Sequence, residues 1–215
     1  MLIFVLGIPG CGKSEFYRRL KKRAKEETLF EEFIKVDDFP KLWSIFMEDE
    51  KTGQWKRSRK TYDGGYKVTD QTVWDDILKE LNSDLLSLMN SNSKRVLMLV
   101  EFSRPNYVHS IMNNFSDFII SQSIAVYLDV PFDICWQRNV RRHEKAVSAG
   151  TDDHLVSREE MEKTYSADDK DQLDKSLPVP VICIKNDTSD ENDFKKLDDG
   201  IESVVHYIKE SLGNE

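Results

Sequence analysis

Five short runs of apolar residues are spaced along the 215-residue chain, each four residues or longer. They cover residues 2–6, 33–36, 95–100, 124–130 and 179–184. Val, Ile and Leu are frequent in these runs, which largely lack the apolar–polar alternation of a strand with one solvated face. The pattern therefore predicts five strands of a parallel sheet that is covered on both faces.

Between these runs, apolar residues recur at intervals of three and four, as on one face of a helix. The spacing predicts helices over 73–89, 108–118 and 194–212, and Ser157-x-x-Glu160 is a capping-box pattern at the start of a short helix. Strands that alternate with helices favour βαβ units with right-handed crossovers. We expect one α/β domain over residues 1–215.

The stretch at about 48–69 interrupts this alternation. It is polar, contains a basic stretch at 56–60, and ends near Gly64-Gly65. We interpret it as a polar insertion on the surface of the domain.

Composition narrows the class of protein. The net charge of −8 argues against broad binding of nucleic acid or anionic membranes, which needs dense positive charge. The chain has no apolar run of 18 residues, and its apolar start is too short for a signal peptide. Cys11, Cys135 and Cys183 lie far apart, without the C-x-x-C spacing of a zinc or redox site. We expect a cytoplasmic protein that does not enter membranes, and the sequence gives no indication of its oligomeric state.

The first apolar run leads into a complete phosphate-binding motif. Residues 7–14 read Gly7-Ile8-Pro9-Gly10-Cys11-Gly12-Lys13-Ser14 and match G-x-x-x-x-G-K-[ST] in full. Glycines let such a loop curl so that successive backbone N–H groups point at phosphates, and the helix that follows adds its positive end. Lys13 is predicted to reach the β- and γ-phosphates of ATP, and the Ser14 hydroxyl to bind Mg²⁺.

Two carboxylates, Asp37 and Asp38, follow the second apolar run. In parallel α/β sheets, ligands bind at the carboxyl ends of the strands, so these side chains are expected to face the same crevice as the phosphate loop. Asp37 is a candidate base for an acceptor hydroxyl, and Asp38 a candidate acceptor-binding residue. The alternative is a turn in which an Asp caps a helix.

Glu101 and Arg104 follow the third run. The carboxylate of Glu101 is suited to bind Mg²⁺ through water, and Arg104 to hold an anionic part of the acceptor by a bidentate contact. The alternative is a salt bridge on the surface at a helix start.

Three arginines, Arg138, Arg141 and Arg142, lie at helical spacing opposite an apolar stripe. Arg138 and Arg142 are candidates for closing over the triphosphate and stabilising transition-state charge, although a solvated basic face explains the same spacing. Asn186, after the last run, is a candidate for lying beside the adenine, and a simple turn is the alternative.

These residues resemble the nucleoside- and nucleotide-kinase-like group of P-loop proteins, which includes adenylate kinase, uridine kinase and zeta-toxin-type kinases. The sequence at 36–39 is similar to the segment of uridine and nicotinamide riboside kinases whose first Asp is the base. Residues 101–104 look like the D-G-F-P-R segment of adenylate kinase, whose Arg holds the acceptor phosphate. The resemblance implies a five-stranded sheet in the order 2-3-1-4-5 with helices on both faces, and a helical lid at about 132–175. It mixes motifs of two subfamilies.

Three functional hypotheses follow. In the first, the chain is an ATP- and Mg²⁺-dependent kinase that phosphorylates a hydroxyl of a small molecule, such as a nucleoside or a sugar-like compound. In the second, it is a nucleoside monophosphate kinase, for which Arg104 is essential and Asp37 dispensable. In the third, it is a nucleotide-dependent regulatory ATPase that switches a contact with a partner. A GTPase is disfavoured because the chain contains neither D-x-x-G nor N-K-x-D.

Overall fold

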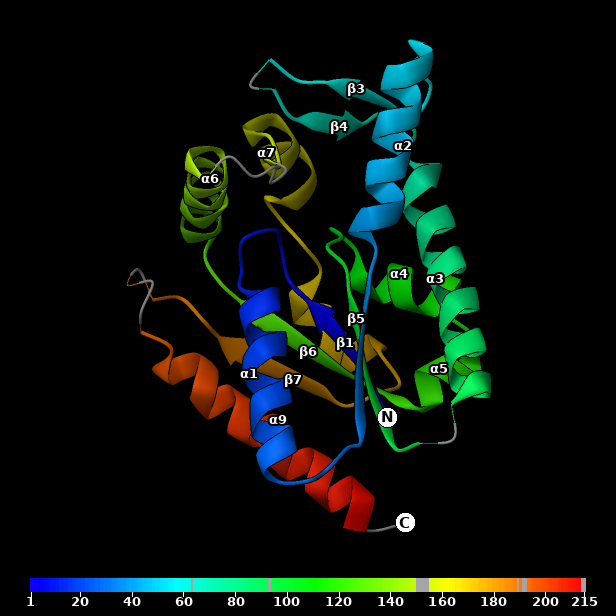
Figure 1. The fold of residues 1–215 in the computed structure, drawn as a ribbon, viewed down its shortest axis with the longest axis vertical. Coiled ribbons are helices and arrows are strands. Elements are labelled where there is room, and N and C mark those ends of the chain that lie inside the picture. The colour runs from blue at the N-terminus through cyan, green and yellow to red at the C-terminus, as the bar shows by residue number, and fades with distance from the viewer. Residues whose placement is uncertain (63, 93, 150–154, 189, 191–192, 214–215) are drawn as a thin grey trace.

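A parallel sheet of five strands in the order β2-β5-β1-β6-β7 forms the centre of the protein (Figure 1). The computed structural model describes residues 1–62, 64–92, 94–149, 155–188, 190 and 193–213. The strands are β1 (Leu2–Leu6), β2 (Glu32–Asp37), β5 (Val96–Glu101), β6 (Ser123–Asp129) and β7 (Val181–Lys185). All five predicted runs are strands, and their chain order corresponds to 2-3-1-4-5, so the predicted fold class is confirmed.

Helices cover both faces of this sheet (Figure 1). One face carries α1 (Lys13–Glu26) and α9 (Lys195–Gly213), whose apolar sides share one core with alternate strand residues. The other face carries α3 (Thr72–Ser91), α4 (Tyr107–Asn114) and α5 (Asp117–Ser121), which enclose a second core. Because both faces are covered, the central strand β1 is buried along its whole length. Among the described residues, no helix is both long and apolar enough to cross a membrane.

The stretch expected as a polar insertion at about 48–69 contains helix and strand residues that the sequence pattern did not predict. Its first residues complete α2 (Phe39–Thr52), and the rest contains an antiparallel hairpin of β3 (Ser58–Lys60) and β4 (Tyr66–Val68). The side chain of Asp49 organises the entry to the hairpin, because its Oδ2 accepts hydrogen bonds from the backbone N–H groups of Arg57 and Ser58 at 2.9 and 2.7 Å. Tyr66 packs inward and stacks on Phe46. The hairpin is therefore part of a small third core with α2 and α3.

A helical region follows β6, within the range predicted for a lid. It contains α6 (Phe132–Ser148), α7 (Arg158–Tyr165), the short 3₁₀ helix η1 (Lys170–Gln172) and α8 (Leu173–Ser176). Glu159 of α7 binds Arg59 of the hairpin at 2.8 Å and also binds Lys67. The hairpin and α7 are thus joined across the top of the molecule (Figure 1).

The acidic stretch that begins at Asp168 is not a simple solvated loop. Asp168 accepts a hydrogen bond from the Tyr127 hydroxyl at 2.6 Å, and the next residue, Asp169, accepts two from the backbone N–H groups of Tyr107 and Val108 at 2.7 and 2.9 Å. A carboxylate at a helix N-terminus satisfies N–H groups that have no partner within the helix. These two carboxylates therefore hold α4 against the carboxyl edge of the sheet.

Candidate active site

The phosphate-loop motif forms the turn between β1 and α1. Gly12 caps α1 with a φ of 104°, and Tyr107 accepts a hydrogen bond from the Gly7 N–H at 3.1 Å. Lys13 is buried and folds back over the loop, where its Nζ donates to the Gly7 carbonyl at 2.8 Å and to the Ser103 hydroxyl at 2.9 Å. The loop is therefore already curled, with its lysine held at the end of β5.

Gly10 is a position where no side chain fits. Its φ is +87°, and a Cβ built there would lie 2.3 Å from the backbone oxygen of Cys135. We expect G10A to lower the free energy of unfolding by about 1–3 kcal/mol and to weaken ATP binding, because the loop must move away from α6. Thermal unfolding and calorimetric titration with Mg·ATP measure the two effects.

The matched control is G53A. Gly53 also has a positive φ, +66°, but a Cβ there meets nothing within 4 Å. The G53A substitution therefore adds only the backbone strain of a positive φ. Because Gly53 lies outside the phosphate loop, we expect ATP affinity to stay unchanged. Equal loss of affinity in both variants would contradict this account of Gly10.

Cys11, inside the loop, is fully buried, and burial raises the pKa of its thiol. The thiolate, which is the form that reacts with oxidants, is disfavoured. This environment fits a small structural loop residue.

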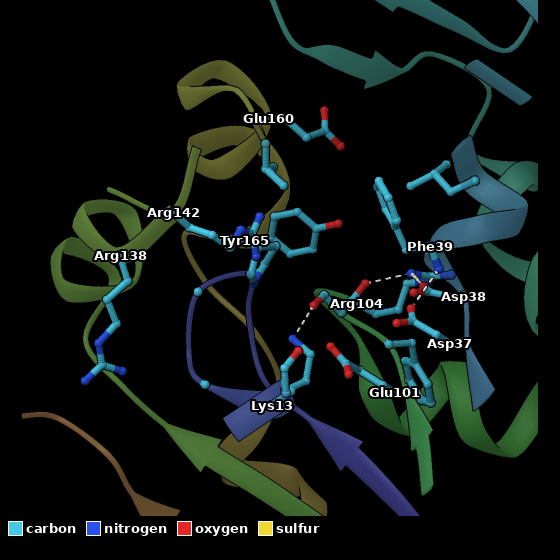
Figure 2. Close-up of a pocket in the computed structure, with 18 of the residues that line it drawn as sticks. Lys13, Asp37, Asp38, Phe39, Glu101, Arg104, Arg138, Arg142, Glu160 and Tyr165 are labelled. Carbon is cyan, nitrogen blue, oxygen red and sulfur yellow. Dashed lines mark hydrogen bonds and ion pairs between the residues drawn. The ribbon is translucent and has the colours of Figure 1, made fainter. Parts of the chain in front are cut away.

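A cavity of about 620 Å³ opens above the carboxyl edge of the sheet. The P-loop, α1 and α6 line one part of the cavity and contribute Lys13, Ser14, Arg18, Arg138 and Arg142, and α2, the hairpin, α3 and α7 line the other part. Arg138 and Arg142 approach from the side opposite Asp38 and Phe39 (Figure 2). The ends of β2 and β5 lie between the two parts and contribute carboxylates. We call the first part the phosphate end and the second part the acceptor end.

Asp37 and Glu101 are register partners at the ends of the neighbouring strands β2 and β5. Lys35 bridges them, with its Nζ at 2.8 Å from Asp37 and 2.7 Å from Glu101. Burial opposes the charged form of this lysine, but the two carboxylates outweigh it, so the pKa of Lys35 lies above its usual value. Asp37 Oδ1 also accepts the Phe39 N–H at 3.0 Å, which is the capping role that was the alternative for this residue. Asp37 both shapes the start of α2 and faces the cavity.

Asp38 and Arg104 form a buried ion pair at the acceptor end. Asp38 Oδ2 lies 2.7 Å from Nη1 of Arg104, and the guanidinium stacks over Trp74 with 4.5 Å between its carbon and the ring centre. The same guanidinium donates to the Ser103 and Trp74 carbonyls, at 2.7 and 3.3 Å. Burial raises the pKa of Asp38 to about 6, against the opposing charge of Arg104. The arginine predicted to hold an anionic acceptor is thus engaged with the chain's own carboxylate and carbonyl groups.

The predicted lid arginines both line the cavity, in different ways. Arg138 donates to the carbonyls of Asn186 and Thr188 at 3.0 and 2.7 Å and ties α6 to the loop after β7. Arg142 extends toward the centre of the cavity beside Tyr165 (Figure 2). Arg141 does not line this cavity and lies on the outer side of α6. Asn186 is buried and donates from its side chain to the Cys11 carbonyl at 2.9 Å, so it supports the phosphate loop from behind.

Ser103, Glu160 and Tyr165 are among the cavity residues that were not singled out from the sequence. Ser103 contacts Lys13, and its place two residues after Glu101 at the end of a strand was the available signal. Glu160 and Tyr165 line the acceptor end from α7, although the sequence pattern assigned Glu160 only to a capping box. Nothing local in the sequence shows that this helix packs over the cavity.

The residues present fit ATP and magnesium. Gly10 and Gly12 of the loop line the cavity, and Ser14 and Glu101 line the same cavity as Lys13. Within the described part of the chain, no three His, Cys, Asp or Glu side chains are grouped to hold a metal. Magnesium in nucleotide sites needs only one or two protein ligands, because phosphates and water supply the others.

Comparison with known proteins places this geometry in a structural class. No family model matches the chain, and no curated protein matches its sequence. Among solved structures, the chain is similar to Mycobacterium tuberculosis APS kinase in complex with AMPPNP and APS, with 15% identity over 97% of this chain and 96% of that one, at a TM-score of 0.51. It is also similar to Chaetomium thermophilum Kti12 in complex with ADP-AlF3, with 14% identity over 97% and 99% of the two chains, at a TM-score of 0.52. The chain has the fold of the P-loop kinases.

That fold confirms the resemblance drawn from the phosphate loop, at the level of architecture. A P-loop kinase fold at these identities fixes the positions of β1, the loop and α1, and leaves the acceptor open. The residues that line the cavity carry the information about the acceptor.

Proposed function

We propose that this protein is an ATP- and Mg²⁺-dependent phosphotransferase that moves the γ-phosphoryl group to a hydroxyl of a small molecule. The observation that carries the proposal is the cavity itself, in which the complete phosphate loop faces the carboxylates of Asp37, Asp38 and Glu101. A basic end suits a triphosphate, and a carboxylate beside it suits an attacking hydroxyl.

In this proposal the P-loop N–H groups and Lys13 hold the β- and γ-phosphates, and Arg142 stabilises charge from the side of α6. Ser14 and Glu101 would hold Mg²⁺, which would supply positive charge to the phosphate oxygens. The acceptor oxygen bonds to the γ-phosphorus as the bond to the β–γ bridging oxygen breaks. ADP leaves, and the hydroxyl proton passes to Asp37.

The contacts of Arg104 favour a hydroxyl acceptor over a nucleoside monophosphate. A phosphate acceptor is anionic and needs a free cation, whereas Arg104 is bound to Asp38 and to two carbonyls. Breaking a buried ion pair to bind a second anion leaves Asp38 without its partner, which is costly.

The test is a phosphorylation screen with γ-labelled ATP over nucleosides, sugar-like alcohols and nucleoside monophosphates. A hydroxyl acceptor that raises ATP consumption above its background rate, with label in the product, is the expected result. Consumption that stays at background with every small acceptor, while a macromolecule binds only in the presence of nucleotide, would instead indicate the regulatory ATPase.

Replacing the candidate base tests the proton-transfer step. We expect D37N to lower kcat by about 10²–10⁴-fold with a small change in the KM for ATP, because general-base catalysis contributes that much. The matched control is D76N, which removes an exposed carboxylate of α3, with 65% side-chain exposure, away from the cavity. A kcat for D37N within a factor of three of the control would show that Asp37 only caps α2.

A further inference from the structure

The two ends of the cavity differ in chemistry. The phosphate end is basic, whereas the acceptor end has walls of aromatic rings. These rings belong to Phe39, Phe46, Tyr66, Trp74 and Tyr165. Phe46 and Tyr66 stack with ring centres 4.9 Å apart and planes 8° from parallel, so this wall is pre-formed. Aromatic walls of this kind are suited to a flat ring on the ligand.

A single carboxylate interrupts the aromatic surface on the α7 side. Glu160 is 5% exposed, and its side chain points across the space between α7 and α2 (Figure 2). One of its oxygens, Oε1, accepts a hydrogen bond from Thr164 at 3.0 Å. For the other oxygen, Oε2, the described residues provide no hydrogen-bond partner. Burial raises the pKa of this carboxyl, and the hydrogen bond from Thr164 and the charges of Lys67 and Lys163 offset the effect of burial only in part.

The orientation of the Glu160 side chain differs from the one that a complete capping box would give it. Ser157 accepts the Glu160 N–H at 3.1 Å, which is one half of a capping box. In the other half, the Glu side chain returns to the N–H of the capping residue, and no such bond from Ser157 to Glu160 exists within the described part of the chain. Glu160 thus extends into the cavity instead of closing its own helix end.

Two basic groups on this side of the cavity have carboxylate partners of their own. Lys67 of the hairpin donates to the neighbouring Glu159, and Arg104 is held by Asp38. Oε2 is not fully enclosed, so a ligand in the cavity can reach it and supply a donor. The acceptor end therefore offers Glu160 Oε2 as a hydrogen-bond acceptor, and the buried Nε of Arg104 as a donor that has no partner among the described residues.

We propose that Glu160 is a specificity-determining residue that accepts a hydrogen bond from an N–H group of the acceptor. The acceptor class is then an uncharged or cationic alcohol with a flat heterocycle that carries amino or ring N–H donors, as in a nucleoside. Sugars without a heterocycle lack the flat group that the aromatic walls would contact. Anionic acceptors would be repelled by the carboxylate of Glu160. The inference rests on the proposed function, because it concerns the acceptor of the same reaction.

The experiment compares matched acceptors with the wild-type protein, E160Q and E162Q. Adenosine is paired with purine riboside, which lacks the exocyclic amino group, whereas ribose represents sugars without a heterocycle and AMP represents anionic compounds. Binding is measured by calorimetry in the presence of Mg·AMPPNP, so that it does not depend on turnover. Glu162 lies on the same helix, exposed and paired with Arg158 at 2.6 Å, and E162Q removes the same charge outside the cavity.

We expect wild-type protein to bind adenosine about 10- to 100-fold more tightly than purine riboside, the value of one hydrogen bond to a charged group. In E160Q this ratio should fall at least fivefold, with Mg·AMPPNP affinity unchanged, and in E162Q it should stay as in wild type. Thermal unfolding checks that E160Q is folded. If it is not, the wild-type series decides alone.

Several results would overturn the inference: no binding of either nucleoside, a ratio near one in wild type, a ratio that survives E160Q, or tighter binding of ribose or AMP. The proposed function fails separately. If the adenosine preference depends on Glu160 but no phosphoryl group is transferred, the acceptor class stands and the reaction does not. If ribose or AMP is phosphorylated while adenosine is not, the kinase reaction stands and the inference fails.

Discussion

K13M is expected to lower phosphoryl transfer by at least about 100-fold, the scale of losing one preorganised cationic donor to the transition state. Lys13 is the buried cation of the phosphate loop, and in the protein it already donates to the Gly7 carbonyl and the Ser103 hydroxyl. Methionine keeps the length of the side chain and removes the charge. Steady-state kinetics with labelled ATP measure the loss, and titration with Mg·AMPPNP shows how much of it is ground-state affinity.

The control for this variant is K22M. Lys22 lies on the same helix with 74% of its side chain exposed, and its contact with Glu26 is 3.9 Å. We expect its activity to stay within a factor of two of wild type. Full activity in a folded K13M protein would contradict the assignment of the loop to a triphosphate.

The second large effect is on stability. R104M is expected to lower the free energy of unfolding by about 3–5 kcal/mol, because it leaves Asp38 buried without its partner. For a domain of this size, that corresponds to a fall in Tm of about 10 °C. Arg104 opposes the rise in the pKa of Asp38, so its loss should raise that pKa further. Thermal and denaturant unfolding measure the effect on stability.

An exposed ion pair provides the comparison. Arg18 binds Glu15 at 2.5 Å with 60% of its side chain exposed, and R18M is expected to cost less than about 1 kcal/mol. The double variant D38N/R104M should recover part of the loss, because no unpaired charge is left buried. Additive losses in the double variant would show that the two side chains are not coupled.

Much of the fold could be predicted from local pattern. The five apolar runs and the loop at 7–14 are continuous in sequence, and parallel strands bring their carboxyl ends to one edge. This is why Asp37 and Glu101, which are 64 positions apart, could be expected at one site, and the register confirms that they are neighbours. Assignment of the base, the metal partners and the lid arginines from the same pattern stays a prediction.

The rest depended on contacts between distant segments. The hairpin strands have three residues each, too short for a periodicity signal, and they are ordered by Asp49 and by packing on α2. The partner of Arg104 could not be read from its flanking residues, because Asp38 comes from another strand end. The capping-box pattern that ends at Glu160 correctly predicted the start of a helix. The direction of the Glu160 side chain, however, depends on where α7 packs.

Glu159 of α7 binds Arg59 and Lys67 of the hairpin, and these two ion pairs link the segments that form part of the acceptor wall. In the proposed reaction, the phosphate loop and α6 contact the phosphates. The opposite wall of the cavity comes from α2, the hairpin and α7, and Glu159 ties the hairpin to α7. We expect that transplanting residues 53–69 together with α7 from another protein of this architecture would alter part of the acceptor wall and leave the phosphate loop unchanged. Changing either segment alone would break these ion pairs, so we expect related proteins with a different acceptor to differ in the hairpin and in α7 together.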